Sequence, residues 1–461
     1  MPRFLSATPN SRLLPLPWGV PLEDWPEQHL VALPRGISRH VVRFIAVGDE
    51  VYAAKEVNEE LALHEYRLLH DLMRLDTPAV EPIGVVSGRV TPDGTPLDPI
   101  LLTKHLQFAL PYRLLFTPGV RNETVLRLVD AMVVLIVRLH LTGFMWGDVS
   151  LSNILFRRDA GEFAAYLVDA ETGELYDQLS PGQRAHDLSI ARVNIFGDFC
   201  DLEAGGMLDE SIDPLTMVET IESRYSELWH ELTGAEEFSG SELHRIESRV
   251  RRLNALGFDI AELDISTSAD GSTVRIQPKV VDAGHHSRRL LRLTGLDTEE
   301  NQARRLLNDL DTYILRAGLR DVDEAVAAHR WFGEDFEPVV RTVPPELTGK
   351  RDSAQIYHEV LDYRWYQSQR EGREVPLLES AQGYVRDVLS KLPDEVMPTL
   401  SIGSGVRVPV SPYDPSLGYL DDPATEVLPA VVDPWEEAAA EVDLTQASRF
   451  DINSLRKARQ K

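Results

Sequence analysis

The stretch that decides the fold is WGDVSLSNILF at residues 146–156, followed by LVD at residues 167–169. It places Asp148 five residues before Asn153, and a second apolar run ends in Asp169. Carboxylate and amide oxygens are ligands that magnesium prefers, and two adjacent loops would bring these three side chains together. The sequence therefore predicts a magnesium site in which Asn153 and Asp169 are the metal ligands.

An aspartate, four residues and an asparagine before an apolar strand is the order that phosphoryl-transfer enzymes use. The approach to the motif also matches, because residues 126–140 read as a buried helix that leads through His140, Gly143 and Phe144. The segment thus resembles the catalytic loop of the protein-kinase-like superfamily. This resemblance implies a two-lobed kinase-like fold that binds ATP and magnesium, with Asp148 accepting the proton of the attacking hydroxyl.

A lysine on a strand and a glutamate on the next helix form an independent part of the expected site. A kinase binds the α- and β-phosphates with this lysine and positions the lysine with the glutamate. Residues 51–57 read as a strand that carries Lys55, and residues 59–75 as a helix whose inward stripe includes Glu65. Because an unpaired buried charge is costly, we expect Glu65 to pair with Lys55. Two alternatives stay open. Glu65 pairs instead with His64 or Arg67, or Lys55 pairs instead with Glu59 or Glu60.

The segment LPRGISRHVVRF at residues 33–44 lies between two candidate strands, where the superfamily has its glycine-rich loop. We expect Ser38 and the backbone N–H groups around Gly36 to bind a nucleotide phosphate, with Arg35 or Arg39 supplying charge. An ordinary hairpin turn is the alternative. Residues 100–106 are expected to form the strand and hinge that meet the adenine.

Several positions depart from the protein-kinase pattern. Gly147 replaces the arginine that, in many protein kinases, binds a phosphorylated activation loop. Ser150 occupies the position where many relatives carry a lysine or histidine beside the transferring phosphoryl group. Asp169 is followed by Ala170 and Glu171, so the metal ligand stays while the glycine hinge is lost. Glu171 is a candidate auxiliary ligand, and a salt-bridged surface residue is the alternative.

The region after Asp169 lacks the alanine-proline-glutamate motif, so a peptide-binding platform of the protein-kinase type is not expected. Residues 186–200 read as a helix instead, in which Asp187 is expected to brace the catalytic loop or to be a surface carboxylate. The tryptophan-glycine-aspartate form is closer to the histidine-glycine-aspartate of small-molecule and lipopolysaccharide kinases.

Composition limits the classes of partner. The chain has 461 residues and a formal net charge of −27, so it repels nucleic acid and anionic membranes in bulk. Cys200 is the only cysteine, which excludes an internal disulfide and fits a reducing compartment. No apolar run approaches the length of a membrane-spanning helix, and the proline-containing N-terminus does not read as a secretory signal. We therefore expect a cytoplasmic protein without a transmembrane segment.

The domain organisation is expected to be α+β, with a mostly helical C-terminal domain that contains a β-hairpin at residues 258–281. Met217 to Leu232 and Ser241 to Leu256 show helical periodicity. Asp321 is expected to cap a helix that runs to Trp331. Five regions follow: an N-terminal extension (1–30), a kinase-like domain (31–206), a helical connector (207–256), a C-terminal α/β domain of unknown function (257–395), and a proline-rich acidic tail, largely disordered (396–461).

Two polar clusters in the C-terminal domain are candidate sites. The first is a basic cluster that includes Arg288 and Arg289, which we expect to face the kinase-like cleft or an anionic partner. The alternative is a helix surface paired to carboxylates such as Glu299 and Glu300. The other members of this basic cluster are Lys279, Asp282, His285, His286 and Arg292. The second candidate site is His358 and Asp362, four residues apart on one helix. They are a candidate metal pair or else part of a core or salt-bridged helix.

The combination of the WGD motif with DAGHHSRRLLRLTGL (residues 282–296) and YHEVLDYRWYQSQREGREV (residues 357–375) resembles an uncharacterised actinobacterial family, domain-of-unknown-function family 4032. The resemblance is expected to extend to about residue 395, and the N-terminal half resembles the lipopolysaccharide (Kdo/WaaP-type) kinases. This resemblance implies the superfamily and no substrate. We expect an ATP- and magnesium-dependent phosphotransferase that acts on an unidentified small-molecule, sugar or lipid-linked acceptor, or on a protein. The alternative is a pseudokinase that senses nucleotide or acts as a scaffold.

Overall fold

The computed structural model describes residues 2–7, 10–33, 39–48, 50–116, 120–209, 211–234, 236–239, 258–267 and 273–394. The predicted helix at residues 241–256 and the predicted tail at 396–461 therefore lie outside the described residues. All the described residues belong to one packed unit, which spans Met1–Leu420. None of the helices in the described part of the chain is long and apolar enough to cross a bilayer.

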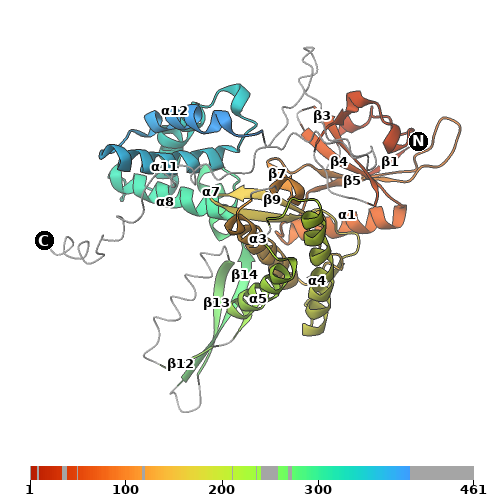
Figure 1. Ribbon diagram of the computed structural model, residues 1–461, viewed down its shortest axis with the longest axis horizontal. Helices are drawn as coiled ribbons and strands as arrows, with labels where there is room; N and C mark the ends of the chain where they lie inside the picture. Colours follow the sequence, from red (N-terminus) through yellow and green to blue (C-terminus); the bar gives the residue numbers. More distant parts are fainter. Residues whose placement is uncertain are drawn as a thin grey trace. The chain divides into compact units, whose positions relative to one another are not determined.

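The N-terminal region is built on a six-stranded sheet against which helix α1 (Glu59–Arg74) packs (Figure 1). Each neighbouring pair of strands is antiparallel. The side chain of Asn58 caps α1 by accepting from Leu61 N. In sheet order the strands are β1 (Arg3–Leu5), β5 (Pro82–Ser87), β6 (Ile100–Lys104), β4 (Glu50–Glu56), β3 (Val41–Val47) and β2 (Leu30–Val31).

Strand β1 and residues 10–30 pack as part of this sheet, whereas the sequence suggested a separate N-terminal extension over residues 1–30. Strand β1 pairs with β5, and Trp18 and Trp25 are buried in the same core as the inward side chains of β3 and β4. The fully buried Arg89 donates to the carbonyl oxygens of Trp18 and Val20, and it pairs with Glu56. A tryptophan-rich segment with many prolines thus stabilises the sheet through its apolar rings and carbonyl groups. Three 3-10 turns lie in this segment: η1 (Ser11–Leu13), η2 (Leu22–Asp24) and η3 (Glu27–His29).

The following region is mostly helical, with α3 (Asn122–Leu141) at its centre, which confirms the buried helix predicted before the motif. Helix α4 (Pro181–Ala204) begins with a capping box at Ser180, and α5 (Pro214–Thr233) packs on α3 and α4. The short elements between them carry the motif. They are β7 (Ala109–Pro111), α2 (Tyr112–Leu115), β8 (Phe144–Met145), η4 (Leu151–Asn153), β9 (Ile154–Asp159), β10 (Glu162–Leu167) and β11 (Glu174–Leu175). Strands β7, β9 and β10 form one sheet, and β8 pairs with β11.

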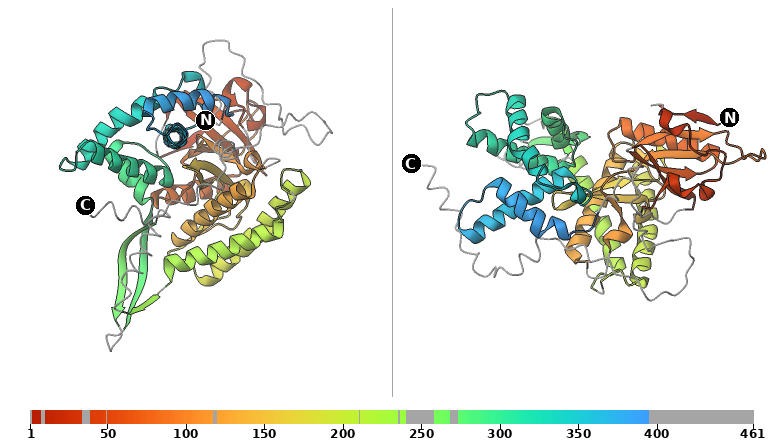
Figure 2. Two further views of the ribbon diagram at one scale, coloured as in Figure 1. Left: turned by 60° about the vertical axis from the view of Figure 1, so that its left-hand side comes forward. Right: turned by 90° about the horizontal axis from the view of Figure 1, so that it is seen from above.

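The C-terminal region contains the predicted β-hairpin and a layer of helices (Figure 2). Strands β13 (Phe258–Thr267) and β14 (Thr273–Ala283) form the hairpin, and β12 (Glu236–Ser239), which the sequence did not predict, adds to β14. The helical elements are α7 (His285–Thr294), α8 (Glu300–Arg316), α9 (Glu324–Trp331), the π-helical turn η5 (Phe332–Phe336), α10 (Glu337–Val340), η6 (Pro345–Leu347), α11 (Ser353–Glu371), α12 (Leu377–Asp387) and η7 (Leu389–Lys391). Asp323 rather than Asp321 caps α9. The mixed α+β class is confirmed.

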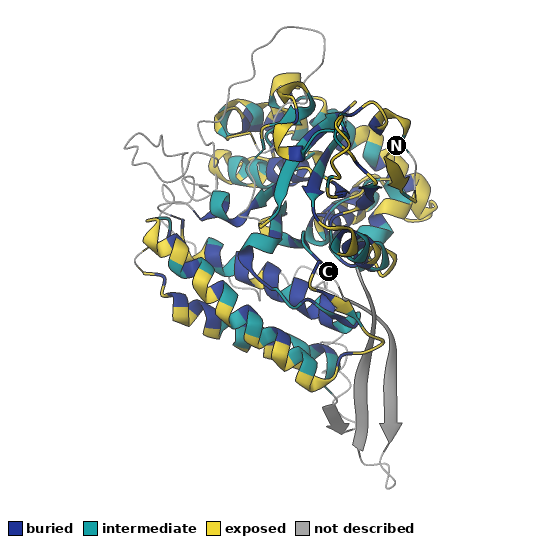
Figure 3. Ribbon diagram, turned by 90° about the vertical axis from the view of Figure 1, so that its right-hand side faces the viewer, coloured by how far each residue is buried: buried dark blue, intermediate teal, exposed yellow. Residues whose placement is uncertain are grey.

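The hairpin turn between β9 and β10 joins the C-terminal helices to the motif-bearing sheet. Asp159 accepts from the backbone N–H groups of Asn301 (3.1 Å) and Gln302 (2.7 Å), so it satisfies donors at the start of α8. Ala160 N donates to Gln355 Oε1 on α11 at 3.1 Å. Figure 3 shows burial from another side, where the long helices α3 and α5 are buried along the faces that pack together and carry exposed residues on their outer faces.

We expect Asp159→Asn to change how stability depends on pH. Burial, followed by the nearby charge of Glu299, raises the pKa of Asp159 to about 7 from an ordinary 3.8. A raised folded-state pKa contributes stability that is fully present below about pH 3.8 and is lost as the pH rises through about 7. The free energy of unfolding of the variant, relative to wild type, should therefore rise by about 2 kcal/mol between pH 5 and pH 8 in urea titrations.

The matched control for this prediction is Asp213→Asn. Asp213 also caps a helix, but hydrogen bonds from Thr216 lower its pKa, so its titration lies below this pH window. The same pH dependence in Asp159→Asn as in wild type would contradict the prediction.

Candidate functional site

Helix α4 braces the predicted catalytic loop through Asp187. Its carboxylate accepts from Trp146 N at 2.9 Å and Gly147 N at 2.8 Å, and it contacts the buried His140 at 3.0 Å. Gly147 has a φ of 76°, and a Cβ there would lie 2.9 Å from the carbonyl oxygen of Thr172. The bracing role predicted for Asp187 is confirmed, and the glycine is explained by its backbone conformation.

Two more side chains of α4 contact the same loop, and sequence reasoning missed both. Asn194 Nδ2 donates to Asp148 Oδ1 at 3.0 Å, and Leu151 N donates to Asp198 Oδ2 at 2.7 Å. Burial raises the pKa of Asp198 to about 6. These residues lie seven and eleven positions after Asp187, which is the spacing of one helix face, so a search along that face would have found them.

The loop places Asp148 and Asn153 in contact. Asn153 Nδ2 donates to the backbone oxygen of Asp148 at 3.0 Å and lies 3.3 Å from its Oδ2. This geometry leaves the amide oxygen of Asn153 as the atom that can bind a metal. Val168 N donates to Asn153 O at 3.1 Å, which holds Asp169, the next residue along, close to the loop.

Lys55 lies at the centre of a cluster of three carboxylates. Its Nζ is 3.0 Å from Glu65 Oε2, 2.9 Å from Asp169 Oδ2 and 2.8 Å from Glu171 Oε2. The predicted pair of Lys55 and Glu65 is therefore present, and the other possible partner, His64, contacts Gly173 O instead. Arg67 donates to Leu63 O.

The charges in this cluster depend on one another. Burial opposes the charged form of Lys55, but the carboxylates of Glu65 and Asp169 outweigh burial and raise its pKa. Burial and the charge of Asp169 raise the pKa of Glu65, which is only 1% exposed. The surrounding carboxylates thus stabilise the protonated, cationic form of Lys55.

Glu171 also contacts two residues that immediately precede β3. Arg39 NH2 lies 2.9 Å from Glu171 Oε1, and His40 Nε2 lies 3.0 Å from its Oε2. Burial favours the neutral acid, yet hydrogen bonding to Lys55 and the charges of Lys55, His40 and Arg39 lower the pKa of Glu171. Of the two readings, the salt-bridged one describes the contacts, although the residue is buried rather than on the surface.

The donor set fits magnesium. Ligand oxygens of Glu65, Asp169 and Glu171 lie within 4.8 Å of one another, and they form the one such acidic, histidine or cysteine group among the described residues. Hard carboxylate oxygens together with the Asn153 amide are the ligand type that magnesium takes. The assignment of Asn153 and Asp169 as the magnesium ligands stays a prediction.

The proposed nucleotide-binding loop is only partly described. Gly36 and Ser38 lie outside the described residues, so their predicted phosphate contacts stay predictions. In the predicted hinge, Lys104 N donates to Glu81 O and His105 N to Val51 O, so these two groups are already bonded within the protein. Burial lowers the pKa of the His105 ring to about 4.

The expectation that Arg288 and Arg289 face a cleft or an anionic partner is wrong. Arg288 pairs with Asp76 at 2.8 Å, Arg289 pairs with Glu324, and the neighbouring His286 contacts Glu300. These three residues of α7 pair with carboxylates of the same chain, as in the alternative.

The second polar cluster belongs to a buried, salt-bridged helix. His358 is 3% exposed, its Nε2 lies 3.2 Å from Asp362 Oδ2, and burial lowers its pKa to about 4. Arg305 contacts both residues. No further metal ligand joins this pair among the described residues.

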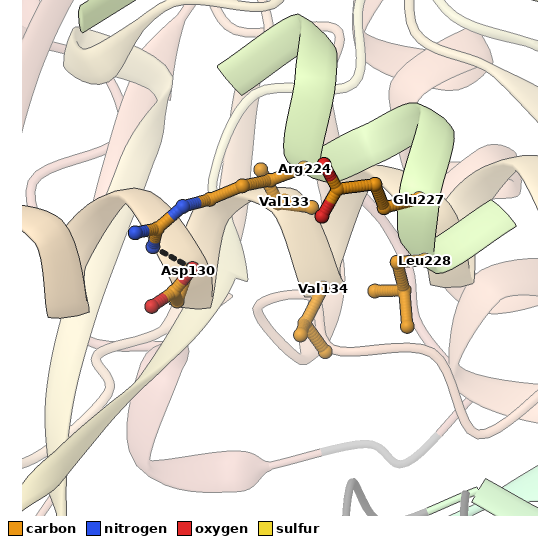
Figure 4. A pocket seen from close by; sticks show the side chains of 6 residues that line it. All are labelled: Asp130, Val133, Val134, Arg224, Glu227 and Leu228. Carbon is orange, nitrogen blue, oxygen red and sulfur yellow. Dashed lines mark hydrogen bonds and ion pairs between the residues drawn. The ribbon is translucent and has the colours of Figure 1, made fainter. Parts of the chain in front are cut away.

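A separate surface pocket of about 330 Å³ lies between α3 and α5 (Figure 4). The pair of Arg224 and Asp130 closes one side of it, and it contains none of the candidate site residues. Its lining is Asp130, Val133, Val134, Arg224, Glu227 and Leu228.

Comparison with known proteins finds one domain match in the C-terminal region. Residues 227–389 match the model of a domain of unknown function, DUF4032, so the chain carries this domain. The predicted resemblance to this family is confirmed for residues 227–389, whereas it was expected over nearly all of the chain up to about residue 395. No curated protein matches the chain. The structure is similar to WaaP in complex with acyl carrier protein, with 15% identity and a TM-score of 0.30, over 49% of this chain and 99% of that one.

Proposed function

We propose that the protein is an ATP- and magnesium-dependent phosphotransferase of the kinase-like superfamily. One observation carries the proposal: Lys55, on a strand, contacts both Glu65 of the next helix and Asp169 at the end of the motif. These residues come from three segments far apart in the sequence, and this is the arrangement that nucleotide phosphates and their metal require. The order of these elements supports the proposal: the strand with Lys55 comes first, then the helix with Glu65, then the loop with Asp148 that precedes Asp169.

The residues of the chain take distinct roles in this proposal. Lys55 binds nucleotide phosphates, and Glu65 orients it. Asn153 and Asp169 hold magnesium, which when bound neutralises the charge that develops on the phosphates. Asp148 accepts the proton of the acceptor hydroxyl while the new oxygen–phosphorus bond forms and ADP leaves. The backbone and Asn194 contacts of the loop keep the Asp148 carboxylate in place.

The acceptor class follows from what the chain lacks. The region after Asp169 leads into α4 rather than into a peptide platform, so we propose a small-molecule, sugar or lipid-linked acceptor. A protein is the other acceptor that we consider.

A second candidate function is a pseudokinase, and specific contacts favour it. Glu171 takes a hydrogen bond from Lys55 at 2.8 Å, and Ser150 Oγ contacts Ser152 Oγ at 2.9 Å rather than supplying a cation. In this alternative the site binds nucleotide, or serves as a scaffold, without turnover.

Incubation with magnesium and ATP labelled on the γ-phosphate separates the two functions. We expect phosphate release, self-phosphorylation or a new labelled species, in the presence or absence of a cell extract. If none of the three appears while ATP still binds, the pseudokinase is the correct function.

A further inference from the structure

The candidate site has few cations near the expected position of the terminal phosphate. Lys55 is buried and already contacts three carboxylates, while Ser150 carries no charge. Phosphoryl transfer develops charge on the transferring group, and sites that perform it supply cations there. Another side chain is needed to supply a cation at this position.

Arg39 is placed to do so. Its NH2 atom is 2.9 Å from Glu171 Oε1 and 3.6 Å from Asp148 Oδ2, so the guanidinium lies between the auxiliary carboxylate and the proposed catalytic base. Its side chain is 69% exposed, whereas that of Lys55 is 11% exposed. An exposed arginine can change partners at little cost, because its charge stays solvated.

We propose that Arg39 binds the terminal phosphate of the nucleotide, with Glu171 as its partner when no nucleotide is present. The inference rests on the proposed function, since it assigns a residue to the same site. A planar guanidinium suits a phosphate, which it can contact through two parallel hydrogen bonds. The exchange does not strand a buried charge, because Glu171 Oε2 keeps Lys55 at 2.8 Å and His40 at 3.0 Å.

The position beside Asp148 is the central part of this assignment. The terminal phosphate must lie next to the base that accepts the hydroxyl proton, because that hydroxyl attacks it. A cation 3.6 Å from the Asp148 carboxylate is therefore near the terminal phosphate rather than the adenine or the α-phosphate. Arg39 should consequently distinguish ATP from ADP.

The test compares nucleotide affinities by calorimetry on the full chain. With magnesium present, Arg39→Ala should lower the affinity for the non-hydrolysable β,γ-imido analogue of ATP by about 10- to 100-fold, the scale of a hydrogen bond to a charged group. The affinity for ADP should change less than about threefold, and Arg39→Lys should recover part of the loss. The control is Arg43→Ala, because Arg43 lies on β3 and donates to Val42 O.

The outcomes separate this inference from the proposed function. If wild type binds both nucleotides and Arg39→Ala weakens them equally or not at all, the assignment of Arg39 is wrong and the nucleotide site stands. Tighter binding by Arg39→Ala would show that Arg39 blocks the site and would also overturn the assignment. No binding by wild type would overturn both.

Discussion

Asp148→Asn is expected to lower phosphoryl transfer by ~10²-fold or more while leaving the affinity for ATP within a few-fold of wild type. The carboxylate is assigned to the acceptor hydroxyl, and it contacts Asn153 and Asn194 rather than Lys55. An amide of the same shape accepts no proton, and its single oxygen keeps one of the two hydrogen bonds that the carboxylate accepts from Asn153 and Asn194. Initial rates with γ-labelled ATP, together with calorimetric titrations, measure the two quantities.

A matched control for this prediction lies on α4. Asp201 is exposed there, and Asp201→Asn changes one charge in the same way outside the loop. Loss of ATP binding in Asp148→Asn would show that the loop faces the nucleotide differently from this account.

Lys55→Met is expected to cost about 3–5 kcal/mol of stability, the scale of a buried ion pair broken on one side. The substitution leaves Glu65 buried without its cation, next to the carboxylates of Asp169 and Glu171. It should also abolish nucleotide binding. Denaturant titration measures the stability, and the double variant Lys55→Met/Glu65→Leu should recover part of the loss because the stranded charge is removed.

The control for the lysine is Lys104→Met. Lys104 is 44% exposed in its pair with Glu50, so its removal should cost no more than about 1 kcal/mol. Equal destabilisation by the two lysine variants would contradict the central position of Lys55 in the cluster.

The parts of the site that the sequence predicted are those with a local pattern. Lys55 and Glu65 lie on adjacent elements, so strand and helix periodicity places both on inward faces. Asp148 and Asn153 lie five residues apart in one short loop, and Asp187 lies in the next predicted helix. In each case the spacing itself carries the information.

The parts that the sequence could not predict depend on long-range packing. Arg39 meets Glu171 across 132 residues, and no periodicity connects them. The first 30 residues read as an extension because prolines interrupt every pattern, yet Trp18 and Trp25 are buried against the sheet. Arg288 finds its carboxylate, Asp76, 212 residues away, so clustering of basic residues did not indicate an external anion.

The most direct test of the central claim is a calorimetric titration of the full chain with ATP, with and without magnesium. We expect saturable binding that requires magnesium and that is lost in Asp169→Ala and Lys55→Ala. Binding should also raise the melting temperature, because a ligand that binds the folded state stabilises it. Absence of magnesium-dependent binding by wild type at millimolar ATP would contradict the account and leave the scaffold as the remaining function.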